Sequence, residues 1–60
     1  MTLADQVRSR LQEALLALHR GLTLAGNSGP IADPLALRTQ LELGRHHVTS
    51  ALAALSKQSP

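Results

Sequence analysis

The chain has 60 residues, of which 43% are hydrophobic and 17% charged, and it contains neither cysteine nor an aromatic residue. A single core in so short a chain supplies only about 3–5 kcal/mol, and the disulfides, thiolate metal sites and aromatic anchors that stabilise many small domains are excluded. A deep catalytic pocket must also be enclosed by more secondary structure than one or two helices provide. We therefore expect a non-enzymatic module, without cofactor or metal, that another polypeptide stabilises.

The charge balance is mild, because six Lys and Arg oppose four Asp and Glu and leave a net charge of +2. Binding to a phosphate backbone requires a cluster of cations rather than a small excess, so the composition does not favour nucleic acid as the main partner. The first residues show no basic region followed by an apolar run, and no stretch approaches the roughly 18 apolar residues of a membrane span. The expectation is a cytoplasmic protein.

Apolar residues at alternating spacings of four and three predict a first helix over 3–25. Thr2 suits the N-cap, with Asp5 three residues later, and Gly26 tolerates the left-handed geometry that ends many helices. The predicted apolar stripe of this helix comprises Leu3, Val7, Leu11, Ala14, Leu18, Leu22 and Ala25.

The segment GNSGPIAD, over 26–33, predicts a loop, and a second helix is expected over 34–57. Asp33 can cap free backbone amides, and Pro34 suits the first helical position. We interpret Gly44 as a point where the facing helix approaches closely. The second predicted stripe comprises Leu37, Leu41, Gly44, Val48, Ala51, Leu52 and Leu55.

Together these elements predict an all-α fold over 1–60, an antiparallel two-helix hairpin that is completed by a partner or, as the alternative, by dimerisation into a four-helix bundle with an RNA-binding or regulatory role. If the two stripes face each other, two broad faces remain. One is solvated and somewhat basic, and Arg8, Arg38 and Arg45 on it could follow RNA if a homodimer doubled the patch. The other is small, flat and mostly uncharged, and we predict that it binds a partner. Its residues are Ala14, Ala17, Gly21, Leu24, Ala36, Gln40, Leu43, His47, Ser50 and Ala54. Leu16, directed away from its stripe, is either a further contact or a lone surface leucine.

The histidines do not form a metal-binding pattern. His46 and His47 are adjacent and diverge by about 100° around a helix, and only Glu42 with His46 has the i,i+4 spacing of helical ligands. That pair is read more simply as a surface charge contact. Likewise, no serine is predicted to lie near both a histidine and a carboxylate in a concavity. No catalytic or metal-binding residue is therefore predicted.

The stretches VRSRLQEALLALHRGL and ALRTQLELGRHHVTSALAAL resemble, in length, order and texture, the small helical-hairpin co-chaperones of type III secretion systems, the YscE and PscE family. The entry to the second helix at Pro34 departs from the Glu-Gln-Tyr-like entry of several members. The resemblance implies a cytoplasmic hairpin that binds and stabilises a tetratricopeptide-like chaperone of the needle subunit. It implies that the hairpin is held by Leu11, Leu15, Leu18, Leu41, Val48 and Leu52, and that the chaperone is met by Ala14, Ala17, Leu43, His47 and Ala54.

Overall fold

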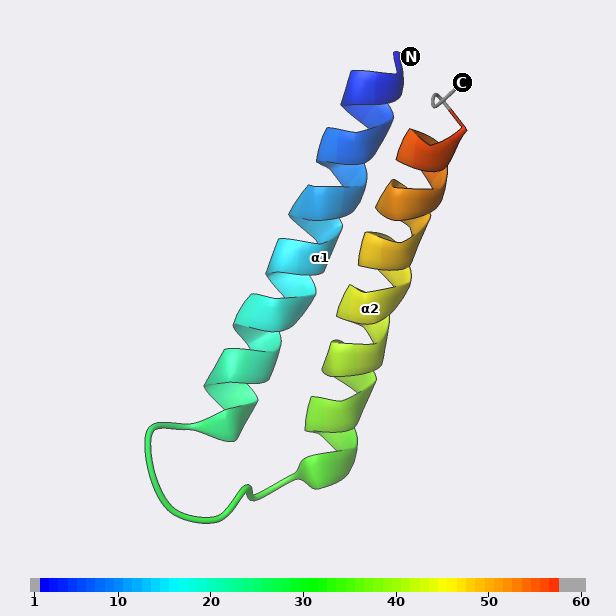
Figure 1. Cartoon of the computed structure of the whole chain (residues 1–60). Coiled ribbons are helices and arrows are strands. Elements are labelled where there is room, and N and C mark those ends of the chain that lie inside the picture. The colour runs from blue at the N-terminus through cyan, green and yellow to red at the C-terminus, as the bar shows by residue number, and fades with distance from the viewer. Residues whose placement is uncertain (1, 58–60) are drawn as a thin grey trace.

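The computed structural model describes residues 2–57, which form two helices joined by an exposed loop (Figure 1). Helix α1 spans Leu3–Ala25 and helix α2 spans Pro34–Ser56. The predicted all-α antiparallel hairpin is confirmed. The bounds of α1 coincide with the predicted range, whereas α2 ends one residue before the predicted position 57 because Lys57 forms its C-cap.

Helix α1 is capped at both ends by local hydrogen bonds. At its start, the Thr2 hydroxyl oxygen accepts from the backbone N–H of Asp5 at 3.1 Å. At its end, the backbone N–H of Gly26 donates to the carbonyl oxygen of Leu22 at 3.1 Å. Gly26 has a φ of 73°, a conformation that residues with a Cβ rarely adopt, so the chain leaves the helix there.

Helix α2 begins where the sequence changes from turn-forming residues to good helix formers. The Asp33 carboxylate accepts from the backbone N–H of Ala36 at 3.1 Å, and Pro34 occupies the first turn, where a missing N–H costs nothing. At the other end, the Lys57 backbone N–H donates to the Ala53 carbonyl oxygen at 3.2 Å. Both helices therefore begin and end at residues suited to capping.

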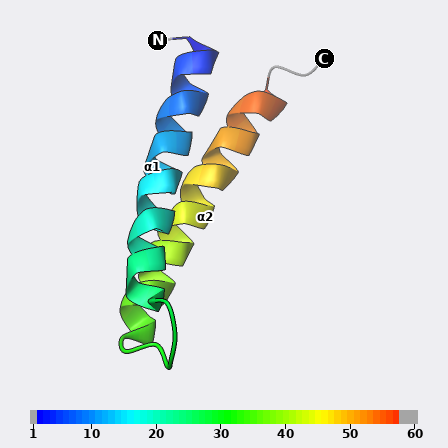
Figure 2. The ribbon, with the colours of Figure 1, turned by 90° about the vertical axis from the view of Figure 1, so that its left-hand side faces the viewer.

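The hairpin is a thin rod with principal extents of 47 × 15 × 14 Å. Its helices run side by side in opposite directions, with the loop at one end, and they cross at a shallow angle when the molecule is turned (Figure 2). A rod made of only two helices has no interior beyond the line along which the helices meet. All tertiary packing is therefore concentrated on that line.

That line, here called the small-residue seam, is built from alanine and glycine. It consists of the five buried residues Ala14, Ala17, Gly21, Gly44 and Ala51. A Cβ added at Gly44 would lie 3.8 Å from the carbonyl oxygen of Ala14, so a single methyl group here would already contact the backbone of α1. Leucine side chains would hold the helices apart at this level. The seam is therefore closed by residues without bulk.

The prediction that the two leucine-rich stripes face each other is wrong in its rotation. Ala14, Gly44 and Ala51 do lie in the seam, but Leu11 and Leu52 are turned outward and expose 49% and 59% of their surface. The physical reason is close approach. Once glycine and alanine bring the backbones together, the leucines fit only along the flanks of the contact.

Candidate interaction surface

The residues predicted to bind a partner lie mainly between the two helices. Ala14, Ala17 and Gly21 are buried against α2, and Leu43 is turned outward, with 40% of its surface exposed. The remaining six are half-buried along the seam and its margin: Leu24, Ala36, Gln40, His47, Ser50 and Ala54. Three of the ten are therefore closed off by the hairpin itself, and six are open to solvent only in part.

A different surface emerges from the residues that directly follow seam positions. In α1, Leu15 follows Ala14 and Leu18 follows Ala17; in α2, Leu52 follows Ala51. One residue step turns 100° about a helix axis, and in two antiparallel helices of the same hand that turn leads to the same side of the pair. We call this side the leucine face. It also includes the apolar residues that lie three, four or seven positions along the same helix side, and its members are Leu11, Leu15, Leu18, Leu22, Leu37, Leu41, Val48, Leu52 and Leu55.

Contacts across the seam connect the two halves of the leucine face. The side chain of Leu18 reaches from α1 to within 3.4 Å of the position where a Gly44 Cβ would stand. In return, Leu37 and Leu41 of α2 reach to 3.5 Å and 3.8 Å from the corresponding position at Gly21. Each glycine therefore seats leucines of the opposite helix. The result is a continuous apolar surface across both helices.

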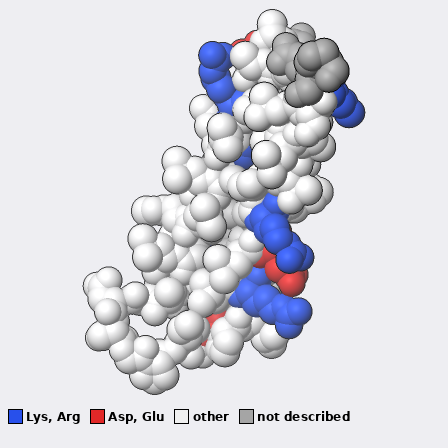
Figure 3. Space-filling model, in the orientation of Figure 1, with Lys and Arg blue, Asp and Glu red and all other residues white. Residues whose placement is uncertain are grey.

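Although three members of the leucine face reach across the seam to the glycines of the opposite helix, the face remains open to solvent. Eight of the nine expose between 38% and 68% of their surface, and Leu37 is half-buried. Figure 3 shows this side of the molecule, with a broad uncharged surface over both helices and charged side chains gathered near the chain ends and along the outer edge of α2. Such an apolar area with a charged margin is typical of a surface that another protein covers.

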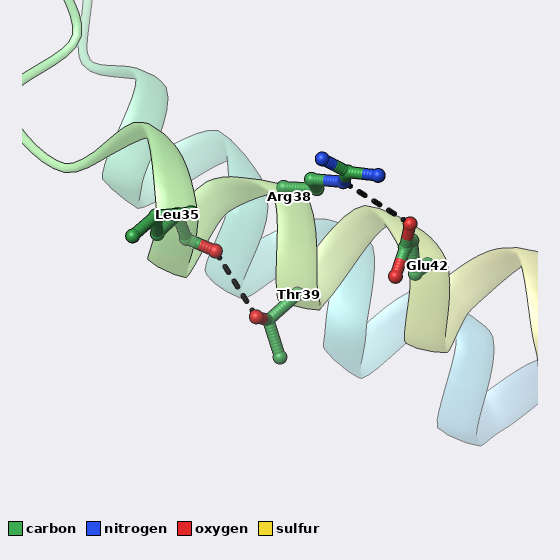
Figure 4. A network of polar contacts seen from close by, with 4 residues as sticks. All are labelled: Leu35, Arg38, Thr39 and Glu42. Carbon is green, nitrogen blue, oxygen red and sulfur yellow. Dashed lines mark hydrogen bonds and ion pairs between the residues drawn. The ribbon is translucent and has the colours of Figure 1, made fainter.

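The charged margin contains both of the ion pairs found within residues 2–57. Arg8 lies 3.5 Å from Asp5, and the Arg38 Nε donates to the Glu42 carboxylate at 3.2 Å. Figure 4 shows the second pair on the outer side of α2, beside the hydrogen bond from the Thr39 hydroxyl to the Leu35 carbonyl oxygen. All four paired side chains are more than half exposed, so each pair adds only about 0.2–0.5 kcal/mol.

These pairs also bear on the arginines considered for RNA. Arg8 and Arg38 each have a carboxylate neighbour, which lowers the positive potential along that edge. Arg45 takes part in neither pair, and it follows Gly44 in the place where the pattern of the leucine face puts an apolar residue. It is therefore the one interruption of the α2 half of that face.

The opposite side of the hairpin is more polar. A shallow groove near the chain ends is lined by residues that include Arg10 and Glu13 of α1 and His47 and Ser50 of α2. Gln40 and His47 of α2 are half-buried on this side of the hairpin. The Gln40 Oε1 and the His47 Nδ1 are both buried and have no hydrogen-bond partner. Leu16 and Leu43 are exposed on this side. They are therefore exposed leucines outside the leucine face, and substitutions there can serve as controls.

Residues 2–57 contain no group of three histidines or acidic side chains placed to hold a metal ion. His46 and His47 contact each other edge-on, with ring centroids 5.4 Å apart. Within the same range, neither helix combines the length and hydropathy needed to cross a bilayer.

Comparison of the chain with family models, curated proteins and solved structures finds no match. The resemblance to hairpin co-chaperones accordingly stays a prediction.

Proposed function

We propose that this chain is a non-enzymatic assembly subunit, whose leucine face packs against helices of another polypeptide to complete a helical bundle. The observation that carries the proposal is the contrast between the seam and the face. The only buried hydrophobic residues within 2–57 are Ala14, Ala17 and Ala51, while twelve of the sixteen Leu, Ile and Val residues in that range remain exposed. Three alanine side chains bury too little apolar area to offset the entropy of ordering the chain.

The partner suited to this face is helical. A flat surface with ridges at i, i+3, i+4 and i+7 spacing fits the side chains of another helix, which pack between its own. Leu11, Leu15, Leu18 and Leu22 provide one such ridge on α1. A partner helix lying over the groove between the two ridges would cover both.

The co-chaperone resemblance supplies one specific form of this proposal. A tetratricopeptide-like chaperone is built from stacked helix pairs and offers apolar helix faces of the required kind. In that form, the chaperone would contact the leucine face. It would not contact the small residues that the resemblance implies, because several of these lie in the seam. The role would be to stabilise the chaperone rather than to act on a substrate.

Site-specific photocrosslinking in cells of the native host tests the proposal. A photoreactive amino acid is placed at Leu41, which is 49% exposed on the leucine face, or at Leu43, which is 40% exposed on the opposite side. We expect an adduct of defined mass from position 41 and none of that mass from position 43. Equal labelling from both positions, or no adduct from position 41, would contradict the proposal. An adduct with a larger helical-repeat protein would support the co-chaperone form.

A further inference from the structure

The size of the leucine face indicates how much surface its partner must provide. Nine apolar residues that are each about half exposed present on the order of 700 Å². This is more than the ~300–600 Å² of the largest apolar patch on an ordinary monomer, and close to the ~800 Å² that each partner buries in a standard stable interface. One flat face of the same size and chemistry would cover it completely.

A second copy of the chain has such a face. Each copy presents the same two ridges over nearly the full length of its helices, so two faces placed together match in length, width and apolar character. The four helices would then enclose all 18 leucine-face side chains of the two copies, nine from each. Two-fold homodimers are also the commonest closed assembly of soluble proteins.

Two such arrangements are possible, and they differ in how the helices pair. With the two-fold axis along the hairpin, α1 of each copy packs on α2 of the other, and both loops lie at the same end. With the axis across the hairpin, α1 packs on α1 and α2 on α2, and the loops lie at opposite ends. Both arrangements bury the same leucines.

Arg45 distinguishes the two arrangements. It is the middle residue of α2 (Pro34–Ser56), beside the leucine face, and it has no carboxylate partner within residues 2–57. With the axis across the hairpin, the two Arg45 side chains meet near the axis, where exclusion of water strengthens their repulsion. With the axis along the hairpin, each Arg45 instead lies beside α1 of the other copy, at the level of Leu18, and the two charges are separated across the bundle.

We infer that the polypeptide covering the leucine face is a second copy of this chain, with α1 of each copy against α2 of the other and both loops at the same end. This inference rests on the proposed function and names its partner. The assembly is a four-helix bundle in which all adjacent helices are antiparallel. Its interior contains the leucine faces, and its loops share one end.

Sedimentation equilibrium of the purified full-length chain tests the stoichiometry. We expect twice the chain mass at micromolar concentration. Leu41→Glu should weaken the dimer by at least ~100-fold, because two carboxylates per dimer enter an apolar interface. Leu43→Glu, the matched control on the opposite side, should change the dissociation constant less than about threefold, as expected for a surface substitution. A monomer at all concentrations, or equal effects of the two variants, would overturn the inference.

Spin-label distances test the arrangement with the leucine face left intact. The chain has no cysteine, so Ser28→Cys gives a single attachment site in the loop. Neighbouring helices pack about 8–10 Å apart, so loops at the same end should give label distances below ~25 Å. The hairpin is 47 Å long, so loops at opposite ends should give distances of ~40 Å or more, which would overturn the arrangement.

The outcomes separate this inference from the function on which it rests. A monomer in solution together with a position-41 photoadduct of another protein would overturn the second copy as partner and leave the proposed function standing. A monomer that also gives no adduct at position 41 would overturn both. A photoadduct of twice the chain mass at position 41 and not at position 43 supports both.

Discussion

Replacing Gly21 with alanine is the substitution whose effect the structure defines most closely. Gly21 is buried in the seam, four residues before the end of α1. A Cβ built there would lie 3.5 Å from Leu37, 3.8 Å from Leu41 and 3.9 Å from Gln40, and all three distances are ordinary van der Waals contacts. The added methyl group therefore fits without displacing α2.

Two favourable contributions follow from that fit. Alanine is better than glycine inside a helix by about 1 kcal/mol, and burying one additional carbon adds up to about 0.8 kcal/mol. Gly21→Ala should therefore raise the free energy of unfolding by about 1–2 kcal/mol. In a chain of this size, each kcal/mol raises the melting temperature by about 4–8 °C.

Thermal and urea unfolding followed by circular dichroism measure this change, and the chain concentration must be held equal because any self-association contributes to apparent stability. Gly26→Ala is the matched control, since it makes the same chemical change at a φ of 73° and a ψ of −173°, a conformation essentially confined to glycine, and it should destabilise by about 1–3 kcal/mol. If Gly21→Ala were destabilising, the helices would be closer at this level than the structure has them, and the reasoning would fail.

Three further substitutions test other parts of the hairpin. Ala17→Leu should cost about 1–3 kcal/mol in urea unfolding, because Ala17 is only 1% exposed and a larger side chain must push the helices apart; an unchanged midpoint would contradict the seam. Asp33→Ala should lower the melting temperature through loss of about 1 kcal/mol of capping at Ala36, whereas Asp33→Asn should retain most of it; equal losses would argue against the cap. Glu42→Gln should change the free energy of unfolding by less than about 0.5 kcal/mol, because the ion pair between Glu42 and Arg38 is exposed to solvent. A loss above about 1 kcal/mol would contradict that exposure.

Helix positions could be predicted from the sequence because local interactions set them. The Thr2 and Asp33 caps, the glycine at 26 and the leucine periodicity act within one turn of the chain, and the structure forms both capping hydrogen bonds. The hairpin followed from the loop between two helices of equal length. Those features do not depend on how the helices are rotated about their axes.

The rotation of the helices was predicted wrongly because two apolar stripes lie next to each other on each helix. Leucine periodicity alone favours burying Leu18 and Leu41. The structure instead buries Ala17, next to Leu18, and of the predicted stripe on α2 it buries only Gly44 and Ala51. Which stripe closes the hairpin depends on the distance between the two helix backbones. That distance is set by tertiary packing and not by local sequence. Gly44 was read as a close approach, and combining it with Ala14, Ala17 and Gly21 would have indicated the seam.

Nuclear Overhauser spectroscopy of the isotope-labelled chain shows whether the small-residue seam closes the hairpin, with the leucines along its flank. Cross-peaks are expected within one chain from the Gly44 Hα to the Leu18 methyl groups and from the Gly21 Hα to the Leu37 methyl groups, as the short distances at both glycines require. Absence of both cross-peaks, together with strong contacts within one chain between the methyl groups of Leu11 and Leu52, would show that the leucine stripes close the hairpin instead.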